Sequence, residues 1–428
     1  MAERGADTAV KPQPCISLIT PIKENFVNFN TFSFHPQINA GISRVGYDTP
    51  TQIQSRAIPP ILAGSDVFGL AQTGTGKTAA FVLPMLQHLM KGKRGKLRAL
   101  ILAPTRELAE QTHVAIKELG GQTGLRSISI YGGVSANPQK NRLRKGVDIV
   151  VACPGRLLDL KNQGAIDLRN IEILILDEAD HMFDMGFLPD VKRIISAIPP
   201  KRQTLLFSAT MPGKIHDLAA QIMDHPVTIE IDIAKPIGTI DHAIYPVKQV
   251  QKLDMLLYLL EKHSSNQVLV FTRTKRRASK LAVQLSQAGV SSTSIQGNLS
   301  QSKRQTAMNA FRRGKVKVLV ATDIAARGID VMEVSHVINY DVPDTAEAYT
   351  HRTGRTGRME QTGTAFSLVT QEDLSIVHSI ERTLGKGLER RRVNGFDAVL
   401  KETKKNNSGN KNSRMSRKRN KNRYRASA

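Results

Sequence analysis

AQTGTGKTAAFVLPMLQHLM, residues 71–90, is the most informative stretch of this sequence. A glycine-rich turn leads into a Lys-Thr pair and then into a helical run of apolar residues. Gly74 and Gly76 allow backbone N–H groups to converge on phosphate oxygens, and the helix N-terminus adds partial positive charge. The spacing matches a phosphate-binding loop with one departure, because Ala71 stands where the strict pattern has glycine. The stretch therefore predicts a phosphate-binding loop that leads into a helix.

The same loop supplies candidate ligands for a nucleoside triphosphate and its metal. Lys77 is expected to neutralise the β- and γ-phosphates, and the Thr78 hydroxyl to ligate Mg²⁺. A chance glycine turn is the alternative, but it does not explain a Lys-Thr pair that opens a helix. The residues predicted to hold the nucleotide here are Ala71, Gln72, Thr73, Gly74, Thr75, Gly76, Lys77 and Thr78.

A second metal anchor is predicted farther along the chain, where four apolar residues run into Asp177-Glu178-Ala179-Asp180. Asp177, at the strand tip, is expected to hold Mg²⁺ through its water shell. Glu178 is placed to orient or deprotonate an attacking water. Adjacent acids at a strand end can also simply cap the next helix. The phosphate loop upstream favours the metal site.

Short apolar runs recur on both sides of these motifs, and they predict an α/β fold with mainly parallel sheets. Runs this apolar are typical of strands buried on both faces. The predicted strands are 97–103, 148–152, 171–176, 203–207, 267–271, 317–320, 336–339 and 364–369. The predicted organisation is an N-terminal extension (1–28), a first domain (29–233), a linker (234–241), a second domain (242–392) and a tail (393–428).

Composition limits the partners and the compartment. The chain has 428 residues with 61 Lys and Arg against 37 Asp and Glu, a net charge of +24. This surplus predicts a polyanionic partner, either nucleic acid or, as a weaker alternative, an anionic membrane surface. Hydrophobic residues make up 40%, which excludes global disorder. No apolar run approaches the ~18 residues of a spanning helix. Only Cys15 and Cys153 are present, which suits a reducing, cytoplasmic location.

The basic surplus is concentrated at the C-terminal end. Residues 401–428 carry eleven Lys or Arg and one acid, a net charge of 11 − 1 = +10. So few apolar side chains cannot bury enough surface to offset the entropy of ordering. The segment is therefore predicted to be a disordered basic tail.

The residues Asp177-Glu178-Ala179-Asp180 resemble the name-giving motif of the DEAD-box RNA helicases, and the resemblance extends from about Phe29 to about Val369. It implies two RecA-like domains and an RNA-stimulated ATPase that uses ATP and Mg²⁺. By this resemblance Gln54 reads the adenine edge and Phe29 covers the base. Phe32 and Phe34 are alternatives for the aromatic.

Further motifs follow in the order of the family. The resemblance implies RNA-backbone contacts from both domains, but Cys153 stands where the family usually has Thr. Gln301 and Arg304 resemble another RNA-contact motif of the second domain. The main RNA-binding candidates are Thr105, Arg106, Gly133, Arg156, Arg273 and Thr322. The residues implied to couple hydrolysis to strand separation are Asp180, Ser208, Thr210 and His351.

The second half has no phosphate loop of its own, so it completes the site of the first. The resemblance implies that Asp330 contacts the ATP ribose and that Arg355 and Arg358 are arginine fingers. A guanidinium matches γ-phosphate oxygens and stabilises charge in the transition state. The spacing of Arg352, Arg355 and Arg358 predicts one shared helix face.

The expected function is an ATP-dependent RNA helicase that grips RNA without sequence specificity and separates short duplexes or remodels RNA–protein complexes. An ATP-gated RNA clamp would use the same catalytic residues. A DNA-translocating helicase fits Gln54 and the compact length less well, and a phosphate-loop kinase or GTPase does not need the second-domain arginines. Residues 384–397 resemble the bacterial RhlE-type branch. Ribosomal or RNA-degradation assemblies are expected partners of a monomer.

Overall fold

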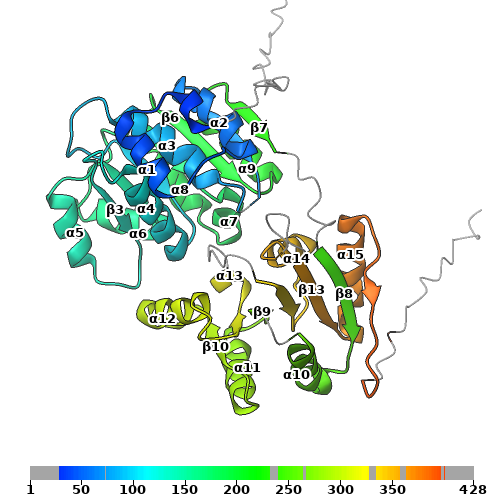
Figure 1. Ribbon diagram of the computed structural model, residues 1–428. Coiled ribbons are helices and arrows are strands. Elements are labelled where there is room, and N and C mark those ends of the chain that lie inside the picture. Colours follow the sequence, from blue (N-terminus) through cyan, green and yellow to red (C-terminus); the bar gives the residue numbers. More distant parts are fainter. Residues whose placement is uncertain are drawn as a thin grey trace, which may run out of the picture.

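The computed structural model describes residues 28–72, 74–231, 240–263, 267–326, 334–356, 363–396 and 400. They form two α/β domains, each built on one sheet with helices on both faces (Figure 1). Thr73, Asp330, Arg358 and the basic tail lie outside the described residues.

The first domain has a seven-stranded, all-parallel sheet in the order β3-β4-β2-β5-β6-β1-β7. Its apolar strands lie between two hydrophobic layers, one on each face. The strands are β1 (Val67–Leu70), β2 (Ala99–Leu102), β3 (Ser127–Ile130), β4 (Ile149–Ala152), β5 (Ile173–Leu176), β6 (Gln203–Ser208) and β7 (Val227–Glu230). The helices are α1 (Pro36–Arg44), α2 (Gln52–Leu62), α3 (Lys77–Leu89), α4 (Arg106–Gly120), α5 (Ala136–Arg144), α6 (Pro154–Asn162), α7 (Ala179–Asp184), α8 (Leu188–Ile195) and α9 (Gly213–Ile222).

The second domain repeats the architecture with the sheet order β10-β11-β9-β12-β13-β8-β14, again all parallel. Its strands are β8 (Ile240–Pro246), β9 (Val268–Phe271), β10 (Ser292–Ile295), β11 (Val318–Ala321), β12 (His336–Asn339), β13 (Gly363–Val369) and β14 (Glu389–Arg390). Its helices are α10 (Lys252–Lys262), α11 (Lys275–Gln287), α12 (Gln301–Arg312), α13 (Asp323–Ala326), α14 (Ala346–Thr353) and α15 (Leu374–Leu384).

Two sequence-based boundaries need correction. The predicted linker ran to Asp241, but Ile240 and Asp241 already belong to β8, where they pair with β13. The predicted tail began at residue 393, yet Val393 and Phe396 pack against the hydrophobic core of the second domain. In both places one or two apolar residues within a polar stretch complete the domain.

The parallel topology determines where a site can form. All carboxyl ends of the strands in a parallel sheet meet at one edge, and ligands of open α/β sheets bind in the crevice outside that edge. The loops after β1, β2, β5 and β6 carry the phosphate loop and the Thr105, Asp177 and Ser208 motifs. They are therefore brought together at one edge of the first sheet.

Candidate active site

The phosphate loop begins directly after β1 and ends at the first residue of α3, Lys77. Gly74 and Gly76 adopt φ values of +90° and +94°, in the left-handed region that favours glycine. A Cβ at Gly76 would also lie 2.5 Å from the Gln54 side-chain nitrogen, so no larger residue fits there. The Lys77 ammonium is buried and donates to the Ala71 carbonyl at 2.9 Å. The Lys77 ammonium is thus bonded to the loop itself, and phosphate oxygens can replace the Ala71 carbonyl as its acceptor.

The predicted adenine-reading residues lie against this loop. The Gln54 side chain accepts from the Thr51 backbone N–H at 2.9 Å and donates to the Gly76 carbonyl at 3.1 Å. Gln54 therefore ties α2 to the end of the phosphate loop. Phe29 is buried and stacks on Tyr47 with ring centroids 6.1 Å apart. The pairing of the two aromatics was missed in the sequence, although both flank the motif.

Asp177 and Glu178 follow β5, and both side chains are almost completely buried. Burial raises the pKa of Asp177 to about 7, although the charge of Lys77 acts in the opposite direction. Burial would also raise the pKa of Glu178, but a hydrogen bond with His181 and the charges of His181, Lys77 and Arg355 outweigh it. The pKa of Glu178 therefore lies well below its ordinary value. Glu178 is ionised, as a general base must be.

The donor set fits a magnesium ion. Asp177 is a carboxylate taken out of water, and a cation beside it would supply the charge compensation that burial removes. Within the described residues, no group of three or more His, Cys, Asp or Glu could hold a metal by itself. Mg²⁺ in nucleotide sites is usually held by only one or two protein carboxylates, and substrate phosphates and water complete its shell. Thr78, at the start of α3, is the second protein ligand that this arrangement offers.

Asp180 connects the acidic motif to the end of β6. Its carboxylate accepts from the backbone N–H groups of Ala209 and Thr210, at 3.1 and 2.9 Å, and from the Thr210 hydroxyl at 3.1 Å. The Ser208 hydroxyl accepts from the Asp180 backbone N–H at 3.3 Å. Three of the four residues predicted to act in coupling, Asp180, Ser208 and Thr210, thus form one hydrogen-bonded unit beside Glu178.

The RNA-binding candidates of the first domain gather on the loops after β2, β3 and β4. The Arg106 guanidinium lies where a Cβ of Gly133 would be, 2.2 Å from that position, and Gly133 has a φ of +77°. The Arg156 guanidinium donates to the Val134 carbonyl at 3.1 Å. Its other terminal nitrogen, Nη1, is buried without a hydrogen-bond partner among the residues described. Arg106 and Gly133 are therefore in direct contact, and Arg156 is joined to the same loop through the Val134 carbonyl.

Two residues of this group have structural roles. The Thr105 hydroxyl accepts from the Leu108 backbone N–H at 3.3 Å, so it caps α4. Cys153 occupies the corresponding position before α6 and makes no side-chain cap hydrogen bond. Burial raises the pKa of its thiol to about 12, which leaves it a neutral, inert group.

In the second domain, the expectation of three arginines on one helix face is wrong. α14 ends at Thr353, so Arg355 lies in the turn beyond it. Arg352 is buried instead in the domain, where its guanidinium forms a bidentate pair with Asp323 and donates to Asn339 and to the Asp341 carbonyl. Arg355 is buried too, but its charge acts on Glu178 of the first domain.

The structure also places three further candidate residues of the second domain. Thr322 is buried at the end of β11. The Arg273 side chain is half exposed and pairs with Asp344 at 3.2 Å. His351 lies on α14 and faces the first domain, where its ring meets His181 edge to face at 5.0 Å between centroids.

Two cross-domain contacts were not predicted. Arg304, expected to bind RNA, forms an ion pair with Glu107 of α4 at 2.7 Å, and both side chains are largely buried. His181, which carried no expectation, contacts both Glu178 and His351. No sequence signal joins residues so far apart in the chain, because each partner is defined only when the two domains meet.

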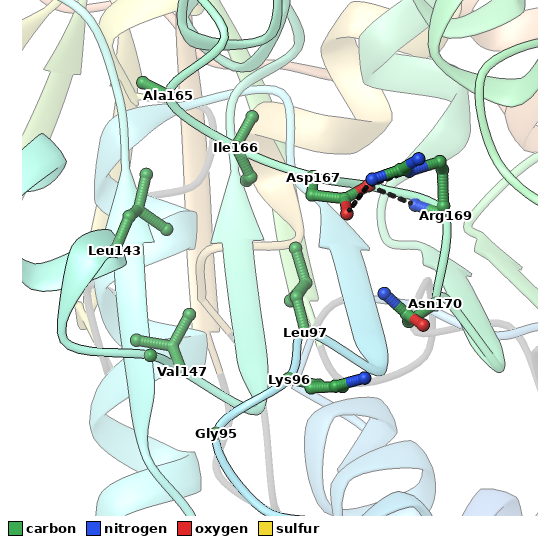
Figure 2. Close-up of a pocket in the computed structure, with 11 residues that line it drawn as sticks. Gly95, Lys96, Leu97, Leu143, Val147, Ala165, Ile166, Asp167, Arg169 and Asn170 are labelled. Atoms are coloured by element: carbon green, nitrogen blue, oxygen red, sulfur yellow. Dashed lines mark hydrogen bonds and ion pairs between the residues drawn. The ribbon is translucent and has the colours of Figure 1, made fainter.

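A cavity of about 550 Å³ lies at the opposite edge of the first sheet (Figure 2). The loops before β2, β4 and β5 line it, with Leu97, Val147 and Ile166 as apolar walls and an Asp167–Arg169 ion pair at its side. None of the predicted ATP or RNA residues is among those lining it. The predicted nucleotide site therefore does not coincide with this cavity.

Membrane crossing finds no support. Among the helices that the structure describes, none combines the length and apolar character that crossing a bilayer requires.

Comparison with known proteins agrees with the geometry. Residues 51–218 match the DEAD/DEAH box helicase family and residues 251–360 match the helicase conserved C-terminal domain. The DEAD-box ATP-dependent RNA helicase CshA of Geobacillus kaustophilus is 39% identical over 87% of this chain and 80% of that protein. The RNA helicase CrhR of Synechocystis is 44% identical over 81% of this chain and 71% of that protein.

A solved structure of Saccharomyces cerevisiae Dbp5 bound to RNA and ADP BeF3 superposes with a TM-score of 0.76 at 32% identity, covering 86% of this chain and 95% of that one. The phosphate loop, the acidic motif and the two RecA-like domains thus occur together in the same order as in known RNA helicases. The chain belongs to the DEAD-box family of ATP-dependent RNA helicases, RNA-binding enzymes that hydrolyse ATP.

Proposed function

We propose that ATP is hydrolysed at the interface between the two domains, by residues that only domain closure brings together. The observation that carries the proposal is the position of Glu178, which is buried and ionised in the first domain under the charge of Arg355 from the second. A base and an arginine supplied by different domains make hydrolysis depend on closure.

In this mechanism the residues of the chain have separate roles. Lys77 leaves the Ala71 carbonyl and binds the β- and γ-phosphates. Glu178 accepts a proton from water, the water oxygen attacks the γ-phosphorus, and ADP leaves with the electrons of the broken P–O bond. Arg355, with Arg358, stabilises the charge that develops on the γ-phosphoryl oxygens. Mg²⁺, held by Thr78 and Asp177, would neutralise phosphate charge.

The nucleotide base and ribose would be held on either side of the crevice. Gln54 is already bonded to Gly76, so an adenine that bonds to Gln54 is directly linked to the phosphate loop. Phe29 would cover the base, and Asp330 would bind the ribose. The nucleotide ligands proposed in the loop itself are residues 71–78.

RNA would bind through its backbone on the surface formed by Arg106, Gly133 and Arg156, with Thr105, Arg273 and Thr322 as further contacts. Contacts to phosphate and ribose carry no sequence information, so the grip would be sequence-tolerant and RNA-selective. Asp180, Ser208, Thr210 and His351 would transmit closure to this surface. Bending of the gripped strand would separate short duplexes or remodel RNA–protein complexes.

The proposal extends to placement in the cell and in the family. Residues 384–397 support an RhlE-type branch, and a phylogeny of full-length relatives, including the CshA and CrhR proteins, would test that placement. A cytoplasmic monomer that joins ribosomal or RNA-degradation assemblies fits the basic charge and the two cysteines.

Two substitutions test the assigned roles together. Lys77→Ala should abolish turnover mainly by weakening ATP binding, because a charge partner of the phosphates disappears. Glu178→Gln keeps the size of the side chain but loses the base, so ATP and RNA should remain bound while hydrolysis stops. ATP affinity and single-turnover hydrolysis, measured with saturating RNA, separate these outcomes. An equal loss of ATP affinity in both variants would contradict the roles.

An ATP-gated RNA clamp remains the second candidate, because it would use the same catalytic residues. Release of a labelled strand from a short duplex supports the helicase. Prolonged retention of single-stranded RNA without strand release supports the clamp.

A further inference from the structure

The His181 side chain lies between the proposed base and the second domain. It belongs to the first turn of α7, and its ring is 2% exposed. Its Nδ1 is 2.8 Å from Oε2 of Glu178, the residue three positions earlier in the chain. Glu178 itself has a left-handed backbone with φ of 52°, a costly conformation for a side-chain-bearing residue. Backbone and side chain of Glu178 are thus both held in one defined arrangement.

The chemistry of the pair fixes the proton on the ring. A carboxylate only accepts hydrogen bonds, so the Nδ1 atom of His181 carries the hydrogen and donates. The other ring nitrogen, Nε2, has no hydrogen-bond partner among the described residues. The His181 backbone N–H donates to the Asp180 carboxylate at 3.0 Å, which anchors the residue to the coupling unit. The donor to Glu178 is therefore rigidly oriented from both sides.

The opposite side of the ring meets the second domain. The His351 ring of α14 contacts His181 edge to face, with centroids 5.0 Å apart and planes at 86°. Arg355, two residues beyond α14, acts on Glu178 at the same interface. Glu178, to which the ring is bonded, is itself under the charges of Lys77 from α3 and Arg355 from the second domain. His351 thus contacts the ring from the second domain.

We propose that His181 is a positioning residue for ATP hydrolysis, which fixes the rotation of the Glu178 carboxylate and is itself fixed by His351 when the domains close. The inference rests on the proposed role of Glu178 as the base. A charge-assisted hydrogen bond sets which carboxylate oxygen meets the attacking water, and misplacement of a reacting group slows turnover without weakening substrate binding. His181 would thereby report domain closure to the base.

Three substitutions at position 181 separate positioning from packing. His181→Asn keeps a donor near the place of Nδ1, His181→Gln moves the donor to about the place of Nε2, and His181→Leu keeps bulk without any donor. Single-turnover hydrolysis at saturating RNA, the KM for ATP and the melting temperature are measured for each. We expect kcat to fall roughly tenfold or more in the Leu and Gln variants, the effect of losing one hydrogen bond to a charged group. The KM for ATP should change less than about twofold by the same reasoning, since substrate binding is untouched.

The Asn variant should recover most of the rate, and this rescue is what a mere packing role would not produce. In a Glu178→Gln background, His181→Leu should cause no further loss, because His181 acts through Glu178. Near-normal kcat in the Leu variant, or equal losses in Asn and Leu, would overturn the inference. If the His181→Leu variant has a lowered melting temperature, the comparison of kcat between His181→Gln and His181→Asn still tests the inference. Normal turnover of Glu178→Gln alone would refute the proposed base, a result distinct from failure at His181.

Discussion

Arg355 acts from the second domain on a base in the first, so its substitution tests closure at the level of one side chain. Arg355→Lys keeps the charge but loses the planar guanidinium that matches phosphate oxygens. We predict a loss of about 10³ in turnover, the size of arginine-finger effects. RNA affinity without nucleotide should barely change. ATPase rates and RNA binding at equilibrium measure the two effects.

Arg352, three residues earlier, is the matched control. Its guanidinium bonds to Asp323, Asn339 and the Asp341 carbonyl inside the domain, so Arg352→Lys should act mainly by lowering the melting temperature. Near-normal turnover of Arg355→Lys would remove it from the catalytic set and leave Arg358 as the better candidate.

The difference between these arginines marks how far single residues could be predicted. Local chemistry in the sequence predicted roles for Lys77, Asp177 and Glu178, and the family resemblance predicted one for Arg355. It could not identify the ion pair of Glu107 with Arg304 or the contact of His181 with His351. These partners come from different domains, and nothing in the local pattern of either member specifies the other.

Among the elements, the loop after β3 has a strict requirement for glycine, because Gly133 combines a φ of +77° with the Arg106 guanidinium at its Cβ position. Gly133→Ala should displace the Arg106 side chain and destabilise the protein by roughly 1 kcal/mol, the cost of a left-handed non-glycine residue. RNA affinity in the presence of a non-hydrolysable ATP analogue should fall about tenfold, as expected for one charged hydrogen bond.

Gly132→Ala provides the control within the same loop. No atom lies within 4 Å of its Cβ position, so that variant should bind RNA as the parent does. Equal effects of the two substitutions on RNA affinity would show that Arg106 and Gly133 do not act together in RNA binding.

Elements were predictable where burial on both faces makes a strand uniformly apolar, as in β2, β4 and β5. The edge strands β3 and β10, with the sequences SISI and STSI, escaped prediction. Their side chains alternate between apolar and polar or are half buried, so they lack a continuous apolar run. The strand β1, with the sequence VFGL, was also missed.

At the scale of the whole molecule, the second domain should respond to mild acid before the first. Burial lowers the pKa of His242 and of His336 to about 4, so both are neutral in the folded state near pH 6. The unfolded chain binds more protons between pH 6.5 and 4, and stability therefore falls as pH decreases through that range. In the first domain, Glu110 has a pKa lowered to about 2, so its contribution persists until below about pH 4.5.

Melting curves recorded from pH 7.5 to 4.5 test this order. The variants His242→Asn and His336→Asn should flatten the loss of melting temperature with acid. His225→Asn, whose side chain is 85% exposed, should leave it unchanged. An unaltered acid response in both buried variants would exclude the two histidines as its cause.

The basic C-terminal segment adds a further property of the whole chain, because residues 401–428, which the structure does not describe, hold a net charge of +10. We predict that the segment tethers RNA non-specifically and raises its concentration near the core. Each neutralised phosphate of a single strand contributes ~0.7 to the log–log salt slope, so about five contacts would give ~3.5. Deletion to residues 1–400 should flatten the slope by that amount and raise the RNA needed for half-stimulation. Turnover at saturating RNA should survive, because the catalytic motifs are intact. The test measures the affinity of the full-length chain and of residues 1–400 for one RNA at several salt concentrations. Identical log–log salt slopes would mean that the segment serves solubility alone.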